Sequence, residues 1–326
     1  QLTLTGASRH NLKNISVTIP LGQLVVVTGV SGSGKSSLVE ETLYPAACHH
    51  LGQPYELDGE AAWESIEGLA TVDQVLLVDP KPIGQTPRSV PVTYLKAFDA
   101  IRRVFAETPL ARQRGYTARQ FSFNATGGGR CDRCGGSGSI EVDMQFLADI
   151  RTVCPECRGT RFGRETLDVT YRGRHIADVL SMSVAEAFTY FRGEDRLRRR
   201  LQFLRDVGLD YLPLGQPATT LSGGESQRLK LASFLSGGSQ RRTLFLLNEP
   251  TTGLHAADVG RLLLCLDNLL AVGHSLVVVE HHLDVIRAAD HVIDLGPEAG
   301  DRGGELVATG TPEEITACAA SITGQW

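Results

Sequence analysis

The sequence feature that most constrains the fold is a glycine-rich loop that directly follows a run of β-branched residues. Residues 24–28 read Leu-Val-Val-Val-Thr, a pattern typical of a strand buried on both faces of a sheet. The loop from Gly29 to Ser36 fits the pattern Gly-x4-Gly-Lys-Ser/Thr, and Ser37–Leu43 is expected to be helical. This order indicates an α/β fold with a phosphate-binding loop.

The chemistry of this loop predicts a bound nucleoside triphosphate. Glycines allow backbone N–H groups to surround phosphate oxygens at the start of a helix, where the helix dipole also favours anions. We expect Lys35 to reach the β- and γ-phosphates and Ser36 to offer its hydroxyl to Mg²⁺. The predicted contacts to ATP and Mg²⁺ in this segment are Gly29, Ser31, Gly32, Ser33, Gly34, Lys35, Ser36 and Ser37.

Three later segments extend the pattern. Leu221–Arg228 reads Leu-Ser-Gly-Gly-Glu-Ser-Gln-Arg, which by itself indicates only a capped helix start. A strand predicted at Thr243–Leu247 runs into Asn248-Glu249-Pro250, and another at Ser275–Val279 runs into Glu280-His281. The order of these segments is similar to that of the ABC ATPase superfamily, which implies an α/β core with a helical subdomain.

That similarity implies a role for each segment. Glu249 would act as the general base that polarises water, and His281 would contact the γ-phosphate. Asn248 would lie at the Mg²⁺ shell. Ser222, Gly223, Gly224 and Glu225 would meet the γ-phosphate of ATP held by a different ATP-binding unit. The similarity therefore implies composite sites and a second ATP-binding unit as a partner.

Four of the seven cysteines form two closely spaced pairs. Nineteen residues separate Cys131-x2-Cys134 from Cys154-x2-Cys157, a spacing typical of structural zinc sites. Each pair lies on a glycine-flanked turn, and four thiolates fill the tetrahedral shell of zinc. The alternative of redox-active pairs is disfavoured by this arrangement. Between the pairs, Ile140–Met144 alternates as a hairpin strand would.

Charge is distributed unevenly along the chain. The net charge of −5 excludes a uniformly basic nucleic-acid binder, but residues 81–165 carry 14 Lys and Arg against 8 Asp and Glu. This asymmetry indicates either a basic insert that faces a polyanion or a solvated arginine-rich face. The sequence has no apolar stretch of membrane-spanning length and no signal peptide, so a cytoplasmic protein without a membrane partner is expected.

Further motifs show a specific family resemblance. The phosphate loop and the Leu-Ser-Gly-Gly-Glu segment lie almost 190 residues apart, much farther than in a transporter ATPase, which disfavours that class. The chain resembles the UvrA family, the damage-sensing ATPases of bacterial nucleotide excision repair. The segments that carry the resemblance are Pro82–Ser89, Arg114–Thr117, Phe121–Asn124, Gly127–Cys131, Arg164–Leu167, Val207–Leu209 and Asn248–His255.

The resemblance implies a domain organisation and partners. It places an ATP-binding core in residues 1–80 and 216–326 and a signature insertion in 81–215, with the zinc module at about 119–165. Members of the family dimerise, grip damaged double-stranded DNA and work with UvrB. The resemblance also implies which residues contact the DNA phosphates, and these are Arg102, Arg103, Arg112, Arg114 and Arg119. It covers the C-terminal ATP-binding unit, so the chain is expected to be a fragment or a half-length relative.

Two residues depart from the family pattern. The family has Asp where this chain has Asn248, and Gln where it has Pro80 after Asp79. A neutral amide is a poorer anchor for the Mg²⁺ shell, so reduced turnover is expected. Two alternatives follow: a paralog that protects its host from DNA-binding drugs, and a module that binds ATP with weak hydrolysis.

Overall fold

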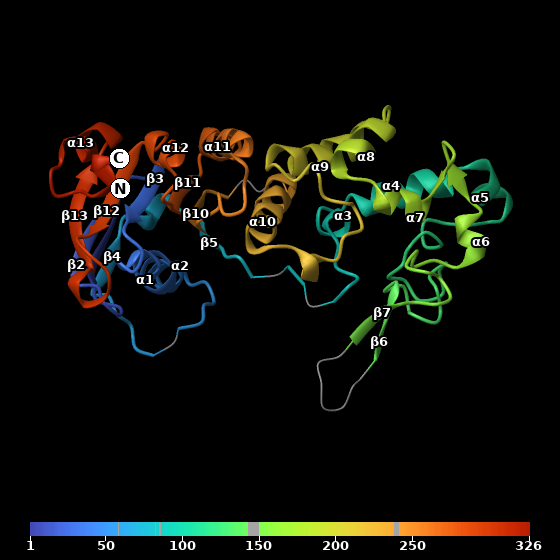
Figure 1. Cartoon of the computed structure of the whole chain (residues 1–326), viewed down its shortest axis with the longest axis horizontal. Helices are drawn as coiled ribbons and strands as arrows, with labels where there is room; N and C mark the ends of the chain where they lie inside the picture. Colours follow the sequence, from blue (N-terminus) through green and yellow to red (C-terminus); the bar gives the residue numbers. More distant parts are fainter. Residues whose placement is uncertain (58, 82, 85, 143–149, 238–240) are drawn as a thin grey trace. The chain divides into compact units, whose positions relative to one another are not determined.

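The computed structural model describes residues 1–326 except positions 58, 82, 85, 143–149 and 238–240. It contains two compact units, which are Gln1–Lys81 with Gly237–Trp326 and, separately, Pro82–Ser236. Both ends of the chain belong to the first unit (Figure 1). The α/β class predicted from the sequence is confirmed. Within the described residues, no helix is both long and apolar enough to cross a membrane.

A six-stranded sheet forms the centre of the first unit. Its strand order is β13-β12-β3-β11-β10-β5, and every neighbouring pair is parallel except β12 with β13. The three predicted buried strands are confirmed as β3, β10 and β11. The strand bounds are β3 (Leu24–Gly29), β5 (Gln74–Val78), β10 (Thr243–Asn248), β11 (Ser275–Val279), β12 (His291–Gly296) and β13 (Glu305–Gly310).

A second sheet and several helices complete the first unit. The sheet is antiparallel with order β2-β1-β4, formed by β1 (Leu2–Ala7), β2 (Ile15–Ile19) and β4 (Ser65–Glu67). Its buried side chains share one apolar core with those of β3, β10 and β11. The helices are α1 (Lys35–Leu38), α2 (Tyr44–Leu51), η2 (Leu69–Thr71), α11 (Ala256–Ala271), α12 (Leu283–Arg287), η4 (Gly300–Arg302), α13 (Pro312–Ala317) and η5 (Thr323–Gln325).

The helix after the phosphate loop differs from the regular helix expected over Ser37–Leu43. It begins at Lys35, and residues Val39–Leu43 form a π-helical turn, η1, that joins α1 to α2. The Thr42 hydroxyl donates to the Ser37 carbonyl five residues earlier at 2.7 Å, which matches the wider turn. Such π-turns are frequent at functional sites.

The second unit is mostly helical. Its helices are α3 (Pro91–Tyr94), α4 (Phe98–Ala106), α5 (Pro109–Gln113), α6 (Arg164–Leu167), α7 (Ile176–Ser181), α8 (Val184–Tyr190), α9 (Asp195–Asp206), η3 (Ala218–Thr220) and α10 (Gly223–Gly237). Buried aromatic rings form much of its core: Phe105 packs on Phe121, and Phe123 packs on Phe98 and Phe162. This core includes Phe98 and Phe105 of α4, and it positions that helix and the loops that carry the cysteines.

Two short hairpins also belong to the second unit. Strand β6 (Ser139–Val142) pairs with β7 (Ile150–Val153), and β8 (Thr170–Tyr171) pairs with β9 (Arg174–His175), both antiparallel. The hairpin strand predicted at Ile140–Met144 corresponds to β6 as far as Val142. Asp143 and Met144 lie outside the described residues.

The two units differ from the predicted domains in one segment. The predicted boundary near residue 81 lies at the junction of the units, but residues 216–236 belong with the second unit. Two contacts account for this: the Ala218 N–H donates to the Ser89 carbonyl at 2.7 Å, and the Tyr211 hydroxyl donates to Glu225 at 2.6 Å. The assignment of domains by function stays a prediction.

Candidate functional site

The phosphate loop connects β3 to α1 and has the backbone that its glycines allow. Gly29 adopts a φ of 132°, and a Cβ there would lie 2.0 Å from the Leu295 carbonyl oxygen. Only glycine tolerates this approach. The Asn11 side chain donates to the carbonyls of Gly32 and Gly300 at 3.1 Å each and so holds the loop from outside.

Lys35 points back into the loop that precedes it. Its ammonium donates to the carbonyls of Gly29 at 2.9 Å and Val30 at 2.8 Å. Burial lowers the pKa of Lys35, and the carboxylates of Glu249 and Asp294 oppose this shift. The two carboxylates therefore favour the charged form of Lys35, and the two loop carbonyls hold its ammonium in place.

Asn248 and Glu249 lie at the carboxyl end of β10, as the sequence predicts. The Asn248 amide nitrogen lies 3.4 Å from the Ser36 hydroxyl and also contacts the Glu40 carboxylate. Burial raises the pKa of Glu40, and the Asn248 contact opposes that shift. Ser36, Glu40 and Asn248 thus offer a hydroxyl, a carboxylate and an amide oxygen, all of which suit Mg²⁺.

His281 follows β11 and lies beside Glu249. Its Nδ1 is 3.8 Å from the Glu249 carboxylate, and both side chains are substantially exposed. The parallel register of β10 and β11 produces this proximity because it aligns Asn248 with Val279. Glu249 has a left-handed backbone with φ 46°, which is uncommon for a residue other than glycine and frequent at functional sites.

A buried carboxylate beneath this pair was not predicted from the sequence. Glu280 has no exposed surface, and its oxygens accept from the Thr251 N–H at 2.9 Å and the Thr251 hydroxyl at 2.6 Å. They also accept from the backbone N–H groups of His281 at 3.0 Å and His282 at 3.2 Å. The sequence signal that could have identified Glu280 is its position directly before His281.

The Leu-Ser-Gly-Gly-Glu segment begins α10 in the second unit. The Ser222 N–H donates to the Glu225 carboxylate at 2.7 Å, and the Glu225 N–H donates to the Ser222 hydroxyl at 3.3 Å. The capped helix start is therefore confirmed. Burial raises the pKa of Glu225, but the hydrogen bonds from Tyr211 and Ser222 lower it by more. The pKa of Glu225 therefore lies below its ordinary value. The role of Ser222, Gly223, Gly224 and Glu225 toward a γ-phosphate stays a prediction.

The four paired cysteines meet in the second unit. Their sulfur atoms all lie within 4.8 Å of one another, with Cys131 and Cys154 at 3.9 Å and Cys134 and Cys157 at 3.6 Å. Backbone N–H groups lower the pKa of Cys154 to about 7, whereas burial raises those of Cys131 and Cys157. Four converging sulfurs form the donor set of a closed tetrahedral zinc site.

The five arginines predicted to contact DNA have different surroundings. Arg102 contacts the Asp99 carboxylate, Arg114 pairs with Asp168 at 3.0 Å, and Arg119 donates to the Thr126 carbonyl. Four of the five are exposed, namely Arg103 on α4, Arg112 on α5, Arg114 and Arg119. Within the described part of the chain, Arg103 and Arg112 form no ion pair, so their charges are the more available of the five.

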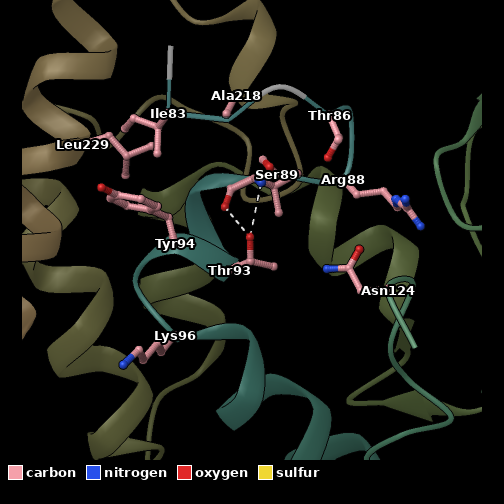
Figure 2. A pocket seen from close by; sticks show the side chains of 11 residues that line it. Ile83, Thr86, Arg88, Ser89, Thr93, Tyr94, Lys96, Asn124, Ala218 and Leu229 are labelled. Atoms are coloured by element: carbon pink, nitrogen blue, oxygen red, sulfur yellow. Dashed lines mark hydrogen bonds between the residues drawn. The ribbon is translucent and has the colours of Figure 1, made fainter. Parts of the chain in front are cut away.

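The second unit also contains an open pocket that the sequence did not indicate. Its volume is about 590 Å³ (Figure 2). The Thr93 hydroxyl donates to the Val90 carbonyl at 2.7 Å and accepts from the Val90 N–H at 3.2 Å. Figure 2 shows Thr93 with Arg88 and Asn124 on one side and Ile83 and Leu229 on the other. The remaining lining includes Tyr94 and Lys96.

Comparisons with known proteins agree with the sequence motifs. The chain is 53% identical over 325 residues to UvrABC system protein A of Aquifex aeolicus and 52% identical over 323 residues to that of Thermus thermophilus. It spans 35% and 34% of those proteins, or about a third of their length. The crystal structure of UvrA2 from Deinococcus radiodurans matches 99% of the chain with a TM-score of 0.88 and 49% identity, over 39% of that structure. No protein-family model matches the chain.

Proposed function

The chain belongs along its whole length to the UvrA family, and we propose that it binds and hydrolyses MgATP as one half of a composite ATPase that acts on double-stranded DNA. The observation that carries this proposal is the convergence of five side chains in the first unit. Lys35 and Ser36 come from the phosphate loop, Asn248 and Glu249 follow β10, and His281 follows β11.

Each side chain has a role that its position supports. The backbone N–H groups of the loop and the Lys35 ammonium would bind the phosphates. Glu249 would accept a proton from the attacking water, and His281, 3.8 Å away, would orient it or the γ-phosphate. Mg²⁺ would be held by Ser36 and Asn248 and would neutralise phosphate charge.

The second unit would supply the DNA-facing surface and half of another site. In this proposal zinc holds the loops around Cys131, Cys134, Cys154 and Cys157 in place and takes no part in the chemistry. Exposed arginines such as Arg103 and Arg112 would contact DNA phosphates without reading bases. Ser222–Glu225 would complete the site of a second ATP-binding unit, and UvrB would be a partner of the assembled protein.

Steady-state ATP hydrolysis, measured with and without duplex DNA that carries a lesion, tests this proposal. We expect Mg²⁺-dependent turnover that DNA changes, and we expect Glu249→Gln to abolish turnover while nucleotide binding remains. Binding without turnover in the unaltered chain would instead support an ATP-binding module, the alternative that Asn248 favours. Absence of both nucleotide and DNA binding would refute the proposal.

A further inference from the structure

We propose that Glu40 supplies to the Mg²⁺ shell the carboxylate charge that Asn248 lacks, so that the two residues act as a pair. This inference rests on the proposed function, because it concerns the metal that accompanies ATP. Its starting point is a contact: the Asn248 amide bridges the Ser36 hydroxyl at 3.4 Å and the Glu40 carboxylate. The carboxylate thereby lies one side chain away from the hydroxyl expected to bind the metal.

The local helix geometry brings Glu40 to this position. Residues four apart on a helix share a face, so Glu40 lies on the same face as Ser36. The π-helical turn at Val39–Leu43, with its Thr42-to-Ser37 hydrogen bond, widens the helix at this point. The next residue, Glu41, instead pairs with Arg9 at 3.3 Å and with His10. The two adjacent carboxylates therefore have different hydrogen-bond partners, and Glu40 is the one that accepts from Asn248 in the structure.

Charge requirements explain why such a pair is useful. Mg²⁺ in proteins is held by one or two carboxylates together with phosphate oxygens and water. Asn248 offers an amide oxygen but no charge. Glu40, half-buried beside it, restores one negative charge and orients the amide by accepting its N–H. We treat Glu40 as a positioning residue that acts through Asn248 and through water on the metal.

The pair arrangement also predicts the effect of restoring an aspartate. Asn248→Asp alone places a second carboxylate against Glu40, and the two like charges repel each other. An aspartate also lacks the N–H that Glu40 accepts from Asn248, so a hydrogen bond between the two positions returns only when Glu40 is replaced by an amide at the same time. The double variant Glu40→Gln with Asn248→Asp exchanges charge and amide between the two positions. That exchange is the specific signature of a pair.

The test is the Mg²⁺ dependence of binding of a fluorescent ATP analogue, measured for the unaltered chain and four variants. Glu40→Gln is expected to raise the Mg²⁺ concentration at half-maximal binding about tenfold, with affinity in EDTA unchanged. Asn248→Asp alone is expected to shift the midpoint upward less than Glu40→Gln does. The double variant should return to within about threefold of the unaltered chain. Glu41→Gln is the matched control and should leave the midpoint unchanged.

The outcomes separate this inference from the proposed function. If the unaltered chain binds the Mg²⁺ nucleotide and Glu40→Gln has the same midpoint, the inference is wrong and the proposed function stands. A double variant no better than Glu40→Gln also overturns the pair. If the unaltered chain binds no nucleotide in Mg²⁺ or in EDTA, both proposals fail. If Glu40→Gln alters thermal unfolding, Glu40→Asp separates charge from packing: it keeps the charge and should keep the midpoint, and a tenfold shift in Glu40→Asp would overturn the inference.

Discussion

The fully buried carboxylate of Glu280 accepts two hydrogen bonds from Thr251, one from its backbone N–H at 2.9 Å and one from its hydroxyl at 2.6 Å. The same carboxylate accepts from the N–H groups of His281 and His282. It therefore connects the turn that follows Glu249 to the strand end that carries His281. This connection gives Glu280 a structural role beneath the two proposed catalytic side chains.

Glu280→Gln is the first prediction. A glutamine amide has one oxygen and an NH₂ group, so whichever way it faces, its NH₂ group points at a backbone N–H of Thr251 or of His281 and His282. We expect a loss of about 2–3 kcal/mol in the free energy of unfolding of the first unit, because a buried hydrogen bond to a charged group is lost. ATP turnover should fall more than nucleotide affinity does. Urea unfolding and steady-state kinetics measure both effects.

Thr251→Val is the matched variant for this prediction. It removes the hydroxyl and keeps the hydrogen bond from the backbone N–H to Glu280. We therefore expect the free energy of unfolding to fall by about 1 kcal/mol, and turnover to fall less than in Glu280→Gln. Equal turnover in Glu280→Gln and the unaltered chain would show that Glu280 does not position His281.

The cysteine cluster leads to a second prediction, on zinc content. The purified chain should contain about one zinc per molecule, and Cys154→Ser should reduce this nearly to zero because all four sulfurs converge on one centre. Cys318→Ser, outside the cluster, is the control and should keep its zinc. Metal analysis with thermal unfolding measures the change. A Cys154→Ser protein with full zinc content would exclude this site.

A third prediction concerns DNA binding by the exposed arginines. Arg103→Glu together with Arg112→Glu should weaken duplex binding at least tenfold and reduce the salt dependence by about two ions. The control is Arg302→Glu in the first unit, which changes the charge at one residue by the same amount. It should have little effect on duplex binding. Arg114 is less suitable because its pairing with Asp168 contributes to the fold. Equal salt slopes for the variant and the unaltered chain would contradict phosphate contacts at these residues.

The buried His274 predicts a pH dependence of stability. It accepts from the Thr243 N–H at 3.1 Å and packs against Phe245 in the core of the first unit. Burial lowers the pKa of His274 below its ordinary value, so the folded state favours the neutral ring. The stability from this residue is present above about pH 6.5 and is lost as the pH falls through the lower folded pKa.

Urea unfolding at pH 7.5 and 5.5 measures this effect. We expect a lower midpoint at pH 5.5 and a smaller difference between the two pH values in His274→Gln, since glutamine keeps an acceptor without titrating. His50→Gln, at an exposed position, serves as the control. An unchanged pH difference in His274→Gln would assign the effect to other groups.

Short sequence patterns predicted part of each unit. The β-branched runs Leu24–Thr28 and Ser275–Val279 are strands because they are buried on both faces of a parallel sheet. The cysteine spacing predicted the cluster in the second unit, which the hairpin β6–β7 and the glycine-flanked turns bring together. In each case the signal lies within a short stretch of sequence.

Contacts between distant residues could not be predicted in the same way. The Glu40–Asn248 contact joins residues 208 positions apart, and it depends on a π-helical turn that no helical periodicity shows. The placement of residues 216–236 depends on contacts such as Ala218 with Ser89. The arginine-rich segments predicted a local positive charge. The ion pair of Arg114 with Asp168 could be seen only in the folded structure, because the two residues lie far apart in the sequence.

The proposed function depends most on the loop from Gly29 to Ser36 as a binding site for ATP. Calorimetric titration of the chain with MgATP, compared with Lys35→Ala, tests this directly. We predict saturable binding by the unaltered chain and affinity at least about tenfold weaker in Lys35→Ala, since the ammonium provides charge-assisted bonds to the phosphates. Lys13→Ala, an exposed lysine of the same unit, should bind as the unaltered chain does. Equal affinity of Lys35→Ala and the unaltered chain, or no binding by either, would contradict the account.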